Sequence, residues 1–311
     1  MKIDDKEQSP NKENSLVTIV IATKNRADCL HSLIDSIHQQ DYKNIEIIIG
    51  DDGSDIAINI IEPDIKIFRS NISRGACFIR NRCLEISQGE FIIIFDDDTE
   101  IRDPSTITRA VTLAEAHSDV GAIAFHQIFA DGTSQAFQPA NVDYLSYIVT
   151  PAFYGCLLRR EALLKLKTGL IEEFNYYYEE VELTLRLLDA GYKVIYDPEL
   201  KVIHYADDRG RNWQRIRRLW ARNAMLTAFL RYPWLAVFPA LIATIITFLR
   251  MQDERRQHDW AGVFWIISNL TNLVPFALSN RCPIKNQTLK LFKQLRNQPM
   301  PVVPQKVNDF T

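Results

Sequence analysis

Short apolar runs alternate with helix-spaced apolar positions along the first 125 residues. The runs are rich in Ile, Val and Phe and each ends in polar residues, so we interpret them as buried strands. They cover 16–22, 45–49, 65–68, 91–95 and 120–125. The intervening segments predict helices around 29–37 and over 76–86 and 105–116. Strands that alternate with helices predict βαβ units and a mainly parallel sheet.

The pattern changes after residue 127. We expect a hairpin over 129–137, because Asp131-Gly132 is typical of a tight turn. Apolar positions at helical spacing predict a helix over 179–190, and two further strands are expected over 192–196 and 201–205. The chain then continues into a basic helix and two long uncharged stretches.

The net charge of −3 conceals two unequal halves. Residues 201–311 contain 17 Lys or Arg and 6 Asp or Glu, a net of +11, whereas residues 1–200 have a net of −14. The uncharged stretches, 232–249 and 260–280, approach the ~20 residues that a helix needs to cross a bilayer. We therefore expect attachment to the cytoplasmic face of a membrane, either as a hairpin or peripherally. The alternative is a pair of helices buried against the rest of the fold.

The basic helix expected over 212–231 contributes to this interpretation. Four arginines at helical spacing could share one side of it, facing anionic lipid headgroups or the phosphate of a lipid-linked acceptor. They are Arg211, Arg215, Arg218 and Arg222. The domain division that follows is a disordered leader over 1–15, a catalytic domain over 16–208, a helical membrane-associating region over 209–296 and a flexible tail over 297–311.

The cysteines and the N-terminus exclude several classes of protein. The five cysteines are odd in number and form no CxxC pair, which argues against a zinc knuckle and a secreted disulfide framework. The first 15 residues are polar and charged, so a cleaved signal peptide is not expected.

Polar clusters follow three of the predicted strands, at 23–26, 51–54 and 96–98. Ligands of open α/β sheets bind beyond the carboxyl ends of the strands, so we expect these clusters to converge. The third cluster is three consecutive aspartates, whose carboxylates repel one another unless a cation or hydrogen-bond donors share the site. A divalent metal would relieve this repulsion; the alternative is a solvated acidic turn.

Five segments together resemble the family 2 glycosyltransferases, which are inverting, nucleotide-sugar-dependent enzymes of the GT-A fold. The segments are VTIVIATKNR, IEIIIGDDGS, SRGACFIRNRCLEISQGEFIIIFDDDT, GCLLRRE and YYYEEVELTLRLLDAGYKVIYDPELKVIHY. They follow the order and spacing of the family, and the resemblance runs from about residue 16 to residue 204. The resemblance implies an α/β, Rossmann-like fold with a mainly parallel sheet flanked by helices, here followed by a C-terminal helical extension.

The resemblance also implies roles for residues at the donor side. Asp96 and Asp98 match the DxD motif and, with His204, would hold Mg²⁺ or Mn²⁺, which prefer hard oxygen ligands. Asp97 occupies the variable position of that motif. The residues that would contact the nucleotide sugar are Thr23, Asn25, Arg26, Asp52, Arg80 and Asp96.

Glu179 and Glu180 stand where the family usually has Glu-Asp. Glu180 matches the catalytic base, which takes the proton of the acceptor hydroxyl. A Glu at this position extends the carboxylate by one methylene. The alternative is that both glutamates only favour the N-terminus of a helix.

We expect an enzyme that moves a sugar from a nucleotide-diphosphate sugar to a saccharide or lipid-linked saccharide, in cell-surface polysaccharide or glycolipid synthesis. Its partners would be the donor, the acceptor and an anionic membrane surface, and not a nucleic acid. One alternative is a sugar nucleotidyltransferase, but IATKNRADCL lacks the glycine-rich loop that such an enzyme would need. A non-catalytic sugar-nucleotide-binding membrane adaptor is the other alternative, and it would be expected to have lost the acidic motifs.

Overall fold

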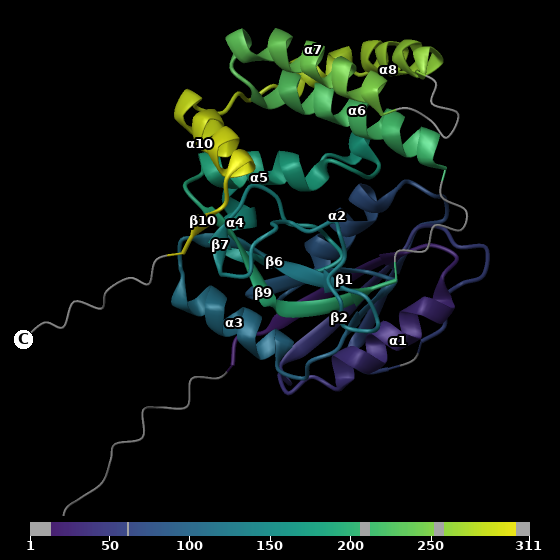
Figure 1. The fold of residues 1–311 in the computed structure, drawn as a ribbon. Helices are drawn as coiled ribbons and strands as arrows, with labels where there is room; N and C mark the ends of the chain where they lie inside the picture. Colours follow the sequence, from purple (N-terminus) through teal and green to yellow (C-terminus); the bar gives the residue numbers. More distant parts are fainter. Residues whose placement is uncertain (1–13, 61, 206–211, 252–257, 303–311) are drawn as a thin grey trace, which may run out of the picture.

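A ten-stranded sheet forms the centre of the computed structural model, which describes residues 14–60, 62–205, 212–251 and 258–302 (Figure 1). Its strands lie in the order β10-β7-β9-β6-β8-β4-β1-β2-β3, with β5 paired to β9. Their bounds are β1 Val17–Thr23, β2 Ile45–Asp51, β3 Ile65–Arg69, β4 Phe91–Asp96, β5 Thr99–Ile101, β6 Val120–Ile128, β7 Ser146–Tyr147, β8 Cys156–Arg159, β9 Lys193–His204 and β10 Met300–Pro301.

The sheet is parallel where the nucleotide-binding segments are expected and mixed beyond them. Strands β4, β1, β2 and β3 pair in parallel, with Val17 opposite Phe91 on one side and Ile45 on the other. Strand β8 is inserted antiparallel between β4 and β6, and β6 then pairs in parallel with β9. Strands β1, β2 and β4 therefore end on the same edge of the sheet, and this edge collects the three polar clusters.

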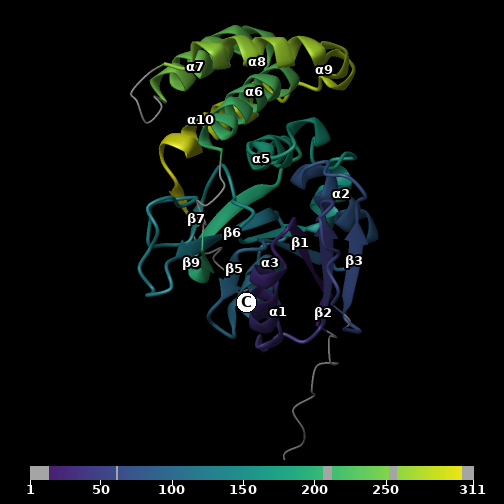
Figure 2. The same ribbon diagram turned by 90° about the vertical axis from the view of Figure 1, so that its right-hand side faces the viewer.

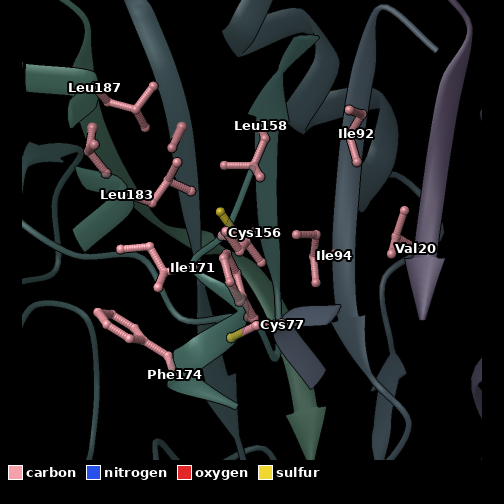
Figure 3. Packing of buried hydrophobic residues seen from close by; sticks show 14 of the residues in the cluster. Val20, Cys77, Ile92, Ile94, Cys156, Leu158, Ile171, Phe174, Leu183 and Leu187 are labelled. Carbon is pink, nitrogen blue, oxygen red and sulfur yellow. The ribbon is translucent and has the colours of Figure 1, made fainter. Parts of the chain in front are cut away.

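Helices cover both faces of the sheet. The helix bounds are α1 Ala27–His38, α2 Ala76–Ile86, α3 Thr106–Ala116, α4 Arg160–Lys165, α5 Glu179–Asp189, α6 Trp213–Arg231, α7 Trp234–Arg250, α8 Trp260–Asn272, α9 Val274–Asn280 and α10 Asn286–Asn297. Helices α1 and α3 contribute to one core. On the opposite face, Cys77 of α2 and Leu183 and Leu187 of α5 pack with Ile92, Ile94 and Leu158 (Figure 3).

The C-terminal helices form a further layer above α5. Helix α6 lies next to α5, and α7 and α8 lie across α6, as two views of the molecule show (Figures 1 and 2). Helix α10 packs Leu289 and Phe292 against Leu185 and Leu188 of α5. Within the described ranges, every helix is too short or too polar to cross a bilayer by itself; α8 and α9 have a suitable combined length and composition but are bent by 57°.

Most of the predicted elements are confirmed, and α2 has the predicted bounds. The two strands expected over 192–205 are instead one strand, β9, which stays paired with β6 through register shifts. The expected hairpin over 129–137 is a tight turn with a single bridge between Ile128 and Ser134, since the chain leaves the sheet there. The uncharged stretch 260–280 is two helices that meet at Leu273.

Both chain ends differ from the expected leader and tail where they are described. Ser15, expected in a disordered leader, hydrogen-bonds Glu90 and Glu115 through its hydroxyl. Met300 and Pro301, expected in a flexible tail, pair with β7. Residues 1–13 and 303–311 lie outside the described part of the chain.

The expected arginine row of α6 is directed largely inward. Arg218 pairs with Asp259, at 2.7 and 2.8 Å, and Arg222 is buried against backbone carbonyls. Arg215 is exposed, and Arg211 lies outside the described residues. The prediction that these arginines form one lipid-facing row is therefore wrong for Arg218 and Arg222, because internal acceptors already bind them.

Buried ionic contacts join α5 to α6. Glu182 accepts hydrogen bonds from Arg186, at 2.8 Å, and from Arg231, at 2.6 Å, and all three side chains are buried. Removing the carboxylate would leave two buried guanidinium groups without their counter-charge.

We predict that Glu182→Ala lowers the free energy of unfolding by about 3–5 kcal/mol, because it leaves two buried positive charges without their counter-charge. The matched control is Glu199→Ala, which removes an exposed carboxylate paired with Lys201 and should cost about 0–1 kcal/mol. Urea titration followed by circular dichroism measures both. Equal losses for the two variants would contradict the prediction.

Candidate functional site

The acidic turn lies at the carboxyl edge of the sheet. Asp96 ends β4, and Asp97 and Asp98 form the turn that leads into β5. Strand β5 pairs antiparallel with the end of β9, with Thr99 opposite His204. This register brings ligand atoms of Asp96, Asp98 and His204 within 4.8 Å of one another. Residues that are over a hundred positions apart thus form one candidate metal site.

His204 presents one defined nitrogen to the two carboxylates. Its Nδ1 lies 2.9 Å from the amide oxygen of Gln127, which can only accept, so Nδ1 carries the proton. The amide nitrogen of Gln127 donates to the carbonyl of Phe137, which fixes its orientation. When the ring is neutral, the Nε2 of His204, 3.2 Å from Asp98 Oδ1, therefore offers a lone pair. Two lone pairs that face each other at this distance suit a bound cation.

The charge state of Asp98 favours the binding of a cation. Burial alone would raise its pKa, but the hydrogen bond and charge of His204 when that ring is protonated, together with Arg26, lower the pKa to about 2. The aromatic ring of Tyr154 stacks on His204, with centroids 5.1 Å apart. An ionised carboxylate beside an oriented imidazole, with Asp96 adjacent, is a ligand set that fits Mg²⁺ or Mn²⁺.

Asp97 lies outside the candidate metal set and anchors the loop after β1. It accepts hydrogen bonds from the Thr23 hydroxyl, at 2.6 Å, and from Arg26, at 2.8 Å. Burial raises the pKa of Asp97 to about 6, and these partners offset part of the effect. Arg26 also donates to Asp98, at 3.0 Å. Thr23 and Arg26, both predicted at the donor side, therefore hold the acidic turn against the first loop.

A buried arginine links the acidic turn to the acidic pair. Arg80 of α2 is 5% exposed and donates to Asp96 and to Glu179, each at 2.8 Å. Glu179 is buried at the start of α5, and Glu180 beside it keeps partial exposure. Burial raises the pKa of Glu180, the adjacent Glu179 raises it further, and Arg80 opposes both. The predicted donor-side and acceptor-side carboxylates are thus separated by one guanidinium.

The backbone immediately before the acidic pair is strained. Asn175, Tyr177 and Tyr178 have φ of 69°, 69° and 77°, in the left-handed region that L residues rarely adopt. Such conformations cost on the order of 1–3 kcal/mol each and persist only where neighbouring groups hold them. This strain sets the direction in which α5 starts and hence where Glu179 and Glu180 lie.

Asn25 and Asp52 are each engaged in loop contacts. Asp52 accepts from the Ser73 hydroxyl, at 2.7 Å, and from the backbone N–H groups of Arg74 and Gly75. Asn25 exchanges hydrogen bonds with Asp55, at 2.8 and 3.1 Å. These contacts join the loops at the ends of the first strands, and direct contact of either residue with a nucleotide stays a prediction.

A large cavity, of about 1010 Å³, lies elsewhere, between α2, α4, α5 and α9. It is lined by Leu158, Leu163, Arg186 and Phe276 among others, and by none of the predicted site residues. Its volume alone therefore does not identify the site of chemistry.

The sequence did not indicate the residues that orient the site. Gln127, Tyr154 and the Asp97 contacts depend on strand register, which the sequence pattern does not specify. The one available signal was the pair His126-Gln127 at the end of a strand that is otherwise apolar and wholly buried.

Comparison with known proteins matches residues 18–169 to the model of Glycosyl transferase family 2. The acidic pair and His204 lie beyond that match. A UDP-Glc:alpha-D-GlcNAc-diphosphoundecaprenol beta-1,3-glucosyltransferase of Escherichia coli is 40% identical over 88 residues, which are 27% of this chain and 35% of that protein. A GalNAc(5)-diNAcBac-PP-undecaprenol beta-1,3-glucosyltransferase of Campylobacter jejuni is 31% identical over 112 residues, 33% of this chain and 36% of that protein.

The match therefore spans about a third of the length of these relatives. Among solved structures, the mannosyltransferase PcManGT from Pyrobaculum calidifontis, in complex with GDP-Man and Mn²⁺, has a TM-score of 0.56 at 16% identity and covers 91% of this chain and 85% of that one. The GT-A fold predicted from the sequence is confirmed, and residues 18–169 of the chain match the model of Glycosyl transferase family 2.

Proposed function

We propose that the protein transfers a sugar, with inversion, from a nucleoside diphosphate sugar to a hydroxyl group of a saccharide acceptor. The observation that carries this proposal is the Arg80 bridge between Asp96 and Glu179. It brings the candidate metal-binding set and the acidic pair to opposite sides of one guanidinium, and a displacement at the anomeric carbon needs both stabilisation of the leaving diphosphate and removal of the acceptor's proton. The leaving diphosphate would lie toward Asp96, and the attacking hydroxyl toward the glutamates.

On the donor side, Asp96, Asp98 and His204 would hold the metal ion that contacts the diphosphate. Mg²⁺ or Mn²⁺ bound by these residues would neutralise the charge that develops on the leaving diphosphate. Thr23 and Arg26 hold the acidic turn in place, and Asn25 and Asp52 would border the nucleotide. The structurally similar mannosyltransferase PcManGT was solved in complex with GDP-Man and Mn²⁺, which supports this class of donor.

The acceptor side would use Glu180 as general base. The acceptor hydroxyl gives its proton to the Glu180 carboxylate while its oxygen forms the new bond to the anomeric carbon and the bond to the diphosphate breaks. Partial exposure leaves Glu180 accessible, whereas Glu179 is buried against Arg80. Glu179 would therefore position the arginine, and Glu180 would transfer the proton.

We further propose a lipid-linked saccharide as the acceptor, in the synthesis of a cell-surface polysaccharide. The names of the relatives from E. coli and C. jejuni specify undecaprenol-diphosphate acceptors. Such an acceptor presents its sugar at a membrane surface, so the enzyme would have to work there.

The outer face of the C-terminal layer is suited to that surface. Its exposed large apolar residues are Trp234, Leu235, Phe238, Ile242, Ile246, Trp260, Phe264, Ile267, Val274 and Leu278. Described residues 232–251 and 258–302 hold six Lys or Arg and one acidic residue, Asp259, which is paired with Arg218. An apolar face within a basic region favours peripheral binding to an anionic bilayer, on its cytoplasmic side.

The metal assignment predicts the effect of Asp98→Asn. Loss of one ionised ligand should weaken Mn²⁺ binding and lower donor turnover by at least about 10²-fold. Isothermal titration of Mn²⁺ in the presence of UDP or GDP measures the affinity. Asp97→Asn is the matched control for affinity, because Asp97 faces Thr23 and Arg26 rather than the metal set. Unchanged Mn²⁺ affinity in the Asp98 variant would exclude this site.

The base assignment predicts that Glu180→Gln lowers kcat by roughly 10²-fold or more, with nucleotide affinity nearly unchanged. The active form is the carboxylate, and its pKa is raised. As the pH falls, activity should therefore be lost at a pH above 4.5, the ordinary pKa of a glutamate. It should return as the pH rises through the raised pKa of Glu180. Glu179→Gln is the comparison, and a larger kcat loss in that variant would reverse the two roles.

The membrane assignment predicts that replacing Leu235, Phe238 and Phe264 together by Gln abolishes sedimentation with phosphatidylglycerol-containing vesicles. Each side chain contributes about 1.5–3 kcal/mol when it leaves water. The thermal midpoint should not fall, because all three are exposed. Leu164→Gln, at an equally exposed position on α4, is the control and should bind normally. Vesicle binding by the triple variant equal to that of the unmodified protein would refute the assignment.

A further inference from the structure

The strained loop before the acidic pair is held from outside the GT-A sheet, by α6. Three of the five residues 174–178 have a left-handed backbone conformation, so the loop needs partners outside itself to keep that conformation. A loop without regular structure also presents carbonyl groups that lack intrahelical or sheet partners. The backbone N–H of Cys77 on α2 binds the carbonyl of Asn175, and two side chains in the middle of α6 bind the carbonyls on either side of it.

Asn223 is the first of these side chains, with 0% exposure. Its amide nitrogen lies 3.0 Å from the carbonyl oxygen of Phe174, 3.1 Å from that of Tyr176 and 2.7 Å from that of Tyr177. An amide nitrogen has two hydrogens, so three carbonyl oxygens saturate it. The last carbonyl in this set is two residues before Glu179.

Arg222 completes the contact. It donates to the carbonyl oxygens of Glu173, at 2.7 Å, and Phe174, at 3.1 Å. It also donates to the amide oxygen of Asn223, at 2.8 and 3.0 Å, and thereby fixes the direction of the amide. The two side chains together bind four carbonyl groups of one short loop.

Aromatic contacts on either side restrict the loop further. Tyr178 meets Trp220 of α6 edge to face, with centroids 6.0 Å apart. The guanidinium of Arg215 lies 5.9 Å from the ring centroid of Tyr176. The loop therefore rests on α6 along its length, while its end continues directly into α5 through the hydrogen bond from Glu182 N to Tyr178 O.

We propose that Asn223, oriented by Arg222, is a positioning residue for the acceptor-side carboxylate Glu180. This inference rests on the proposed role of Glu180 as the base. Asn223 itself touches no substrate in this proposal; it holds the left-handed turn that determines where α5 begins. A displacement of about 1 Å at a reacting group can cost ~10²-fold in rate, so a loosened loop should slow catalysis without removing any catalytic group.

The same contacts give the C-terminal region a second role, which is to support the loop before the acidic pair. Helix α6 lies between α5 and the pair α7 and α8 (Figure 2), and its Asn223 contacts the loop that leads into α5. The base-bearing loop and the apolar face are thus attached to one helix. A chain that ended before α6 would keep the donor-side residues but lose the support of the acceptor side.

The test compares Asn223→Ala with Thr227→Val in the full-length protein. Thr227 lies one turn further along α6, is equally buried, and its hydroxyl has no hydrogen-bond partner among the described residues. We expect Asn223→Ala to lower kcat by at least about tenfold, while the Kd for UDP or GDP with Mn²⁺ stays unchanged. Thr227→Val should leave both at the level of the unmodified protein.

A double-mutant cycle with Glu180→Gln separates positioning from a general loss of stability. If Asn223 acts through Glu180, adding Asn223→Ala to Glu180→Gln should cause little further loss of kcat. Independent, multiplicative losses would overturn the proposal, as would a kcat of Asn223→Ala equal to that of Thr227→Val. Asn223→Asp, which keeps the volume but cannot donate, should reproduce the alanine result and replaces it where the alanine variant does not fold.

The cycle also distinguishes failure of this inference from failure of the proposed function. Full activity of Glu180→Gln alone would refute the base assignment, whatever Asn223→Ala does. Loss of activity in Glu180→Gln, combined with normal kcat in Asn223→Ala, would keep the base and reject the positioning role.

Discussion

Arg80 makes two hydrogen bonds, one to Asp96 and one to Glu179, from a position almost closed to solvent. Without a cation there, the ionised groups of the acidic turn and the acidic pair would raise one another's pKa and resist close approach. Arg26 has a related effect at Asp97 and Asp98. The two arginines allow several carboxyl groups to share the edge of the sheet, and each arginine is supplied by a segment that follows a different strand.

The arrangement depends on a sheet that combines parallel and antiparallel strand pairs. Parallel pairing of β1, β2 and β4 brings the loops that contain Arg26, Asp52 and Asp96 to one edge. Antiparallel pairing of β5 with β9 adds His204, which a purely parallel sheet would not place beside Asp98. The candidate metal site is therefore a consequence of strand register, and its third candidate ligand, His204, comes from the last long strand.

This dependence explains what the sequence could predict. The first strands, α2 and the convergence of the polar clusters follow from periodicity, which is a local property. The merging of two expected strands into β9 does not, because the strand crosses a register shift against β6 that leaves the apolar pattern interrupted near Pro198. Gln127 and Asn223 were likewise not predicted as site residues, since each acts through contacts with segments 77 and about 46–49 positions away.

The charge asymmetry of the chain has a different meaning once its arginines are located. A count assigns the basic excess to the C-terminal region, yet Arg218, Arg222 and Arg231 of α6 bind internal acceptors. The cations left for an anionic surface are those that remain exposed, such as Arg250 and the lysines of α10. Helix α6 therefore directs most of its basic residues inward: its arginines and Asn223 hold α5 and the loop that leads into it, and α7 and α8 above it carry the exposed apolar residues.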